Sequence, residues 1–182
     1  MSYKYNFHFE KLSLSIDRFT EWTGCAVAWL TLAMVTLTCV IVSMRYFFGA
    51  GSIALQESVT YMHALVFLMG AAFTLKRKGH VSVDIFYQRF TPRLKALIEI
   101  LGTLFFLFPV CFVILTFSWD YVISSWVANE SSSEGSGLPW LYLLKSLLLL
   151  MPITMMLQGI SEIIKNTLLL TDSTAPKPQG SL

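Results

Sequence analysis

Charged residues are scarce in this sequence. Asp, Glu, Lys and Arg make up 13% of the 182 residues, whereas soluble globular domains usually carry about 25%. Hydrophobic residues make up 55%. This balance excludes an ordinary soluble globule and predicts an integral membrane protein.

The local patterns of common catalytic and redox sites are also missing. No glycine-rich phosphate loop, CxxC pair or activated-serine pattern occurs, so we expect neither an enzyme nor a cofactor site. Cys25, Cys39 and Cys111 all lie in apolar runs, and an odd number placed in this way predicts packing residues, not a disulfide framework. Residues 1–22 carry charges every few positions and lack a cleavage-site pattern, so no removable signal peptide is expected.

Long intervals without charge predict four membrane-spanning helices, because about 20 mainly apolar helical residues cross the hydrocarbon of a bilayer. The expected spans are residues 22–44, 55–75, 97–119 and 138–161. Pro109 is expected to kink the third span, and Lys145 and Pro152 interrupt the fourth. The predicted fold class is therefore all-α integral membrane, with a single four-helix domain over residues 1–172 and a disordered tail over 173–182.

The basic residues predict the orientation of these spans. Of the 13 Lys and Arg residues, all but Arg45 and Lys145 lie in the two terminal segments or in the loop between the second and third spans. Positively charged segments stay in the cytoplasm, so we expect both termini inside. The connections at 46–57 and 120–137 are then outside, and the second of these, which contains NESSSEGSG, is expected to be flexible.

The stretch KRKGHVSVDIFYQRF follows the second span and predicts a short amphipathic helix over residues 82–90. Its apolar stripe would consist of Val83, Phe86, Tyr87 and Phe90. Such a helix would lie in the cytoplasmic membrane interface, with the neighbouring basic residues near lipid head groups. Val81 and Ile85 fall off the stripe and are candidates for contact with a partner protein. His80 and Asp84 could share a face, but two groups make neither a zinc site nor an active site.

Four ionisable residues lie in or beside the spans. Arg45 and Glu57 are at the outer ends of the first hairpin, where they form either a salt bridge or two independent interface anchors. His63 is a functional candidate because it lies inside a span; the preferred interpretation is a neutral imidazole hydrogen-bonded to a neighbouring helix. Lys145 is expected to extend its ammonium to the interface. The run Gly70-Ala71-Ala72 offers a flat surface for close helix approach.

The spans contain no relay of Asp, Glu and His, no internal repeat and no pair of interrupted helices meeting at mid-membrane. These are the marks of a transport core. By itself, the chain is therefore not expected to form an ion or solute pathway.

The order RYFFGAGSIALQESVTYMHALVFLMGAAFTLKRKGHVSVDIFY, residues 45–87, resembles the small membrane subunit of tripartite ATP-independent periplasmic (TRAP) transporters, the DctQ-like family. The matching features are Arg45-Tyr46, Gln56-Glu57, Gly70-Ala71-Ala72, Gly79-His80-Val81 with Asp84, the segment GLPWLYLLKSLLLLMP, and Gln158-Gly159. The resemblance extends over roughly residues 22–170.

The resemblance implies a complex in a bacterial or archaeal inner membrane. The small subunit would brace a larger multi-span subunit that carries the substrate and sodium sites, and a periplasmic binding protein would deliver the substrate. Family substrates are organic anions such as dicarboxylates, keto and hydroxy acids, and sialic or other sugar acids. Membrane lipids are the other expected neighbours, and no nucleic-acid partner is expected. The alternative is a self-contained four-helix channel or transporter, or a membrane enzyme built around His63, His80 and Asp84.

Overall fold

The computed structural model describes the backbone of residues 2–79 and 90–171, with side chains from Phe9 onward. Throughout these ranges the regular elements are helical. They are α1 (Ser2–Phe48), α2 (Ile53–Lys76), α4 (Pro92–Gly102), the π-helical turn η1 (Thr103–Leu107), α5 (Phe108–Val127) and α6 (Leu141–Thr171). The all-α prediction is therefore confirmed for the described part of the chain.

Four helical stretches are long and apolar enough to cross a membrane. They are Phe9–Phe48, Ile53–Lys76, Pro92–Val127 and Leu141–Thr171. The four-span prediction is confirmed, but the helices extend beyond the expected spans. Residues 2–48 contain no proline. Helix α1 therefore continues without a break through the charged residues that flank its apolar segment. At 1.5 Å per residue, the 47 residues of α1 measure about 70 Å, more than twice the thickness of the hydrocarbon.

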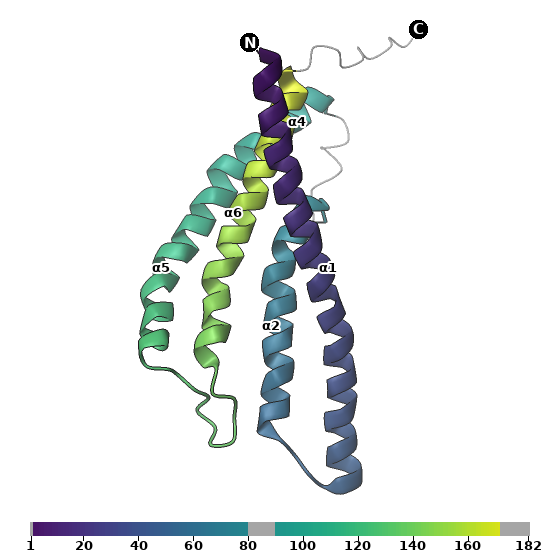
Figure 1. The fold of residues 1–182 in the computed structure, drawn as a ribbon, viewed down its shortest axis with the longest axis vertical. Coiled ribbons are helices and arrows are strands. Elements are labelled where there is room, and N and C mark those ends of the chain that lie inside the picture. Colours follow the sequence, from purple (N-terminus) through teal and green to yellow (C-terminus); the bar gives the residue numbers. More distant parts are fainter. Residues whose placement is uncertain (1, 80–89, 172–182) are drawn as a thin grey trace.

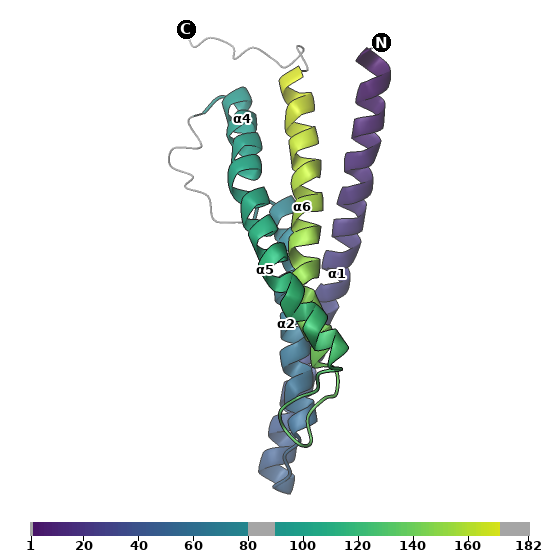
Figure 2. The ribbon, with the colours of Figure 1, turned by 90° about the vertical axis from the view of Figure 1, so that its left-hand side faces the viewer.

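Helix α6 is the centre of the arrangement, since it contacts α1, α2, α4 and α5, while α1 also packs along α2. Figure 1 shows α5, α6, α2 and α1 side by side in this order. The start of α1 and the end of α6 lie at the same end of the molecule, which we call the terminal end, and the connections 49–52 and 128–140 lie at the opposite loop end. Towards the terminal end, α4, α6 and α1 fan apart (Figure 2).

Close approach between α1 and α2 depends on the glycine at position 24. A Cβ at Gly24 of α1 would collide with the ring of Phe73 on α2. Of the Gly70-Ala71-Ala72 run, Ala72 is buried at 2% exposure, whereas a Cβ at Gly70 would meet no atom within 4 Å. The expected close approach at this run is thus made by Ala72, while Gly70 faces open space.

The distortion expected at Pro109 takes the form of the π turn η1. The Phe108 N–H bonds to the Thr103 carbonyl, five residues back, and Pro109 supplies no N–H and crowds the preceding turn. Gly159 of α6 packs directly on this turn, because a Cβ there would lie 2.8 Å from Leu107 and 3.0 Å from Thr103.

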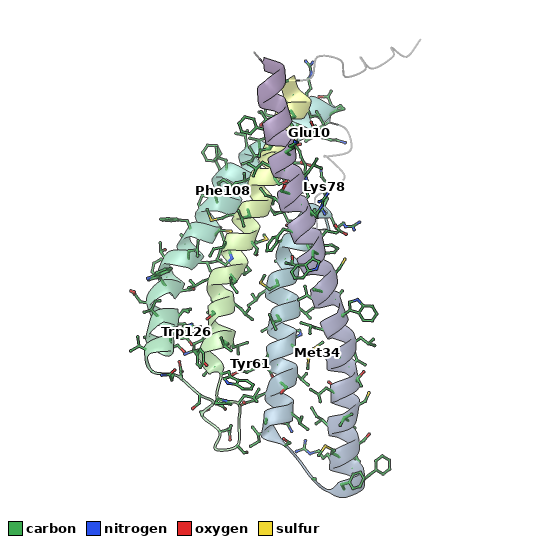
Figure 3. All side chains as sticks on the ribbon, viewed as in Figure 1. Glu10, Met34, Tyr61, Lys78, Phe108 and Trp126 are labelled. Atoms are coloured by element: carbon green, nitrogen blue, oxygen red, sulfur yellow. The ribbon has the colours of Figure 1, made fainter. Side chains whose placement is uncertain are left out.

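The packed core is thin for a chain of this length. Its buried apolar side chains are Val27, Ala72, Ala96, Cys111, Val122 and Leu147. Most other apolar side chains point outward from the helices, as the sticks of Figure 3 show. In water such a surface would aggregate, so lipid or other membrane proteins must cover it. The chain is a multi-pass membrane protein.

Candidate functional site

Polar side chains from three helices meet at the terminal end in a cluster that we call the terminal clamp. Its members are Ser13, Asp17, Thr20 and Glu21 of α1, Glu99 of α4, and Gln158, Ser161, Glu162, Lys165 and Asn166 of α6. Gln158 and Ser161 are completely buried, and Ser13 and Thr20 are each 3% exposed. Buried polar groups in so apolar a chain require partners, and the clamp supplies them.

The Gln158 carboxamide uses both of its polar atoms. Its oxygen accepts from the Thr20 hydroxyl at 2.7 Å, and its nitrogen donates to Asp17 and to Glu162, each at 3.1 Å. A buried amide left unpaired costs about 1–3 kcal/mol. These bonds therefore stabilise the contact between α1 and α6.

The carboxylate of Asp17 is the second centre of the clamp. The Ser161 hydroxyl donates to it at 2.7 Å, so the Ser13 hydroxyl is the donor in the 2.8 Å bond to Ser161. The Lys165 ammonium pairs with Asp17 at 2.7 Å and with Glu162 at 2.8 Å. Three side chains of α6 thus satisfy one carboxylate of α1.

Glu99 joins α4 and the end of α2 to the same cluster. The Asn166 amide donates to one Glu99 oxygen at 2.8 Å, and Lys78 pairs with the other at 2.8 Å. Lys78, just beyond α2, is labelled in Figure 3. The clamp consequently connects all four membrane-spanning units of the described chain.

Glu21 of α1 receives the other two residues of the basic run. Lys76 pairs with it at 2.5 Å and also donates to the Asp17 carbonyl at 2.8 Å. Arg77 pairs with Glu21 as well and lies 5.3 Å from the centre of the Phe73 ring. Lys76, Arg77 and Lys78, which were expected near lipid head groups, thus have acidic partners within the chain.

A second polar cluster, which we call the loop clasp, fastens the 128–140 connection at the loop end. Its members are Glu57 of α2, Ser125 of α5, Glu130, Ser132 and Leu138 of the connection, and Lys145 of α6. One Glu57 oxygen accepts from the Ser132 hydroxyl, and the other accepts from the Leu138 N–H at 2.6 Å. The connection expected to be flexible is therefore held at both of its ends.

Lys145 forms the other half of the loop clasp. Its ammonium pairs with Glu130 and lies 4.1 Å from the centre of the Tyr121 ring. Together with the Ser125 hydroxyl, which donates to Glu130 at 2.6 Å, the Lys145 ammonium holds the pKa of Glu130 below its usual value. Lys145 was expected to extend to the interface; its specific partner is an acidic residue of the connection.

Trp126 adds a further link between α5 and α6 at the loop end, where Figure 3 labels it. Its indole N–H donates to the Ser146 hydroxyl at 2.8 Å, and its ring meets Tyr142 edge-on at 4.7 Å. Edge-to-face aromatic pairs stabilise by about 0.5–1.5 kcal/mol beyond burial.

Two contacts suggested by the sequence are not formed within the described chain. Within the described ranges no ion pair joins Arg45 to Glu57, because both Glu57 oxygens turn to the 128–140 connection and Arg45 is exposed at the last turn of α1. His63 forms no hydrogen bond with a neighbouring helix among the residues that the structure covers. It is exposed and stacks on Phe67 at 6.3 Å between ring centres.

His80, Val81, Asp84 and Ile85 lie outside the described residues, as does nearly all of the helix expected over 82–90. The tail expected to be disordered over 173–182 lies outside them too.

The terminal clamp was missed at the level of sequence, although a signal for it is present. The polar positions of α6 recur at helical spacing, at 158, 161, 162, 165 and 166, and those of α1 at 13, 17, 20 and 21. Each set forms one stripe at the end of an apolar run. When spans are located from intervals without charge, these residues only mark where a span ends. That the two stripes face one another cannot be seen in this way.

Both clusters are built to hold helices together. Across residues 9–79 and 90–171, no group of three or more His, Cys, Asp and Glu side chains is arranged to hold a metal ion. The acidic groups of the clamp and clasp face basic or hydrogen-bonding partners, so none is presented as a free base. What the geometry can do is fix α1, α4, α6 and the end of α2 relative to one another at the terminal end, and α2, α5 and α6 at the loop end.

Comparisons with known proteins agree on one family. The model of the family "Tripartite ATP-independent periplasmic transporters, DctQ component" matches residues 34–168. The C4-dicarboxylate TRAP transporter small permease protein DctQ of Vibrio cholerae serotype O1 (strain ATCC 39315 / El Tor Inaba N16961) is 32% identical over 95 residues, which are 52% of this chain and 40% of that protein. The chain thus aligns with less than half of the relative's length. No solved structure matches.

Proposed function

This chain belongs to the DctQ family of TRAP transporter components, and we propose that it is the small subunit of such a transporter, in which it braces a larger membrane subunit. It is a multi-pass protein of the inner membrane, and as a DctQ-family protein it is a transporter component and not an enzyme. Both termini would be cytoplasmic, because the basic residues gather at the terminal end.

The combination of fixed ends and uncovered sides is the observation that carries this proposal. The terminal clamp ties α1, α4 and α6 together through buried polar side chains, and the loop clasp ties α2, α5 and α6 at the other end. Between them, large apolar side chains such as Trp29 at 72% and Phe117 at 82% exposure point away from the chain. A rigid unit with uncovered sides suits a scaffold that is completed by a partner.

The transport chemistry itself would reside in the partners. We propose that the substrate is an organic anion, that sodium drives its uptake through the larger subunit, and that a periplasmic binding protein delivers it. The relative's name specifies C4-dicarboxylates for that protein, so succinate and malate are the first substrates to test here. Keto, hydroxy and sugar acids complete the class.

Affinity purification of the tagged chain, expressed together with the products of its neighbouring genes, tests the proposal. We expect one complex that contains a larger multi-span polypeptide and that, after reconstitution with the binding protein, takes up organic anions only when sodium is supplied outside. Recovery of a homo-oligomer that transports solute or turns over a substrate by itself would contradict the proposal and support the self-contained alternative.

A further inference from the structure

Helix α2 exposes a single narrow stripe along its length. The exposed or open positions on this stripe are Gln56, Thr60, His63, Phe67 and Gly70. They are separated by four, three, four and three residues, which is the spacing of a helix–helix seam. The stripe is therefore continuous on one face of α2, and no other described helix covers it.

His63 places a polar group near the middle of the membrane. Helix α2 has 24 residues, about 36 Å at 1.5 Å per residue, and His63 is close to its midpoint. Thr60 satisfies its hydroxyl within the helix through a 3.4 Å bond to the Gln56 carbonyl. The His63 imidazole forms no such bond with the rest of the described chain. Facing lipid, its N–H would have no acceptor, which is costly in hydrocarbon.

Helix α6 provides the contrast, because its exposed stripe is entirely aliphatic. Its members are Leu143, Leu150, Ile153, Leu157 and Ile160, with exposures between 39% and 46%. These side chains have no polar group that needs a hydrogen-bonding partner, so the stripe is compatible with lipid. The two central helices of the chain therefore present surfaces of different chemistry.

The shape of the α2 stripe also suits a helix. Phe67 is 71% exposed and projects beside His63, while the open space around Gly70 lets another backbone come close. The Phe67 ring forms a ridge and Gly70 leaves a recess, and the side chains of a second helix can pack against both. Lipid tails would fill the recess but would leave the imidazole unpaired.

We infer that the stripe of Gln56, Thr60, His63, Phe67 and Gly70 is the surface on which a transmembrane helix of the larger subunit docks. That helix supplies the hydrogen-bonding group for His63. The inference rests on the proposed function, since it takes the larger TRAP subunit as the occupant. A second copy of this chain and lipid are the competing occupants.

Photo-crosslinking in the intact complex tests the docking surface. The photoreactive residue p-benzoylphenylalanine replaces Thr60 on the α2 stripe or, as the control on a second exposed surface, Ile153 on the α6 stripe. Both variants are expressed with the larger subunit and irradiated in cells. We expect an adduct with the larger subunit from position 60 and a much weaker one from position 153.

The alternative outcomes are distinct. An adduct from position 153 but not from 60, an adduct between two copies of this chain, or no protein adduct at 60 would each overturn the inference. If the larger subunit still co-purifies in these cases, the proposed function stands and only the surface is wrong. If no larger subunit co-purifies with the unsubstituted chain, the proposed function fails and the inference fails with it.

Substitution of His63 tests the hydrogen bond. His63→Leu should lower recovery of the complex on the order of threefold to tenfold, as expected for the loss of one interhelical hydrogen bond, while His63→Gln should retain most of it. Leu150→Ala on the α6 stripe is the control and should have little effect. The thermal stability of the isolated chain should not fall in His63→Leu. Equal recovery of complex with Leu and Gln would refute a hydrogen-bonding role.

Discussion

The buried carboxamide of Gln158 in α6 donates to the carboxylate of Asp17 in α1 at 3.1 Å. The two residues are 141 positions apart in the chain, and their contact joins the first membrane helix to the last. Gln158 is 0% exposed, so its three hydrogen bonds are not exchanged for bonds to water. Several measurable properties depend on this contact and on its counterpart at the loop end.

Replacing Gln158 with Leu should destabilise the chain by about 1–3 kcal/mol, because it leaves the buried Thr20 hydroxyl without its acceptor and Asp17 without one donor. Thermal unfolding of the purified chain in detergent, followed by intrinsic tryptophan fluorescence, measures the loss. Ile160→Leu, two residues away on the exposed stripe of α6, is the control and should change the midpoint little. An unchanged midpoint for Gln158→Leu would mean that the clamp contributes no stability.

Two glycine substitutions should have opposite effects. Gly159→Ala should destabilise, since the added methyl would press on η1 at 2.8 Å from Leu107 and 2.9 Å from Phe108. We expect a cost of about 1 kcal/mol or more after relaxation. Gly102→Ala meets no atom within 4 Å and should stabilise its helix by about 0.5–1 kcal/mol. The same thermal assay compares them, and destabilisation of equal size at both positions would contradict the packing of α6 on η1.

A double-mutant cycle distinguishes the partners of Glu57. Arg45→Ala and Glu57→Ala should be additive within about 0.3–0.5 kcal/mol, because the two residues do not touch. Glu57→Ala and Ser132→Ala should instead be non-additive by about 0.5 kcal/mol or more, since each removes the same hydrogen bond. Free energies of unfolding for the wild type, the three single variants and the two double variants decide the matter. Strong coupling between Arg45 and Glu57 would show that the salt bridge across the hairpin does form.

The Lys145–Glu130 ion pair should make stability depend on pH. The native pKa of Glu130 is lowered below its ordinary 4.5, so its contribution is complete above about pH 4.5 and is lost as the pH falls through the lower native value. The difference in melting temperature between the wild type and Glu130→Gln should therefore shrink below that pH. Glu134→Gln, in the same connection, is the control. A difference that stays constant from pH 7 to 3 would exclude the ion pair as its source.

Much of the fold could be predicted by deciding, for each segment, whether its residues prefer lipid or water. Four charge-free intervals yielded four membrane-crossing helices, and the motif order from Arg45 to Gly159 identified the family. Helix limits were less accurate, because a charged residue such as Arg18 ends the apolar stretch without ending α1. A kink was expected at Pro109, and the helix has a π turn just before this residue, which could not be foreseen.

The site was harder to predict because its contacts are long-range. Glu57 had an attractive candidate partner, Arg45, in the adjacent outer end of the same hairpin, yet it bonds to Ser132 and Leu138, which are distant in sequence. His63 was expected to bond to a neighbouring helix, and no such bond forms within the described part of the chain. Pairing by proximity in sequence fails here because a connection that is distant in sequence lies beside Glu57 in the folded chain.

The sequence by itself determined that this chain crosses the membrane four times, which family it belongs to, and that its spans carry no relay. Those properties follow from the composition and order of each segment, whatever its neighbours. Only the tertiary structure decided that α6 is central, that Asp17 meets Gln158 and Lys165, and that His63 faces outward. Helix pairing depends on which side chains complement one another across an interface, and that complementarity exists only once the helices are assembled.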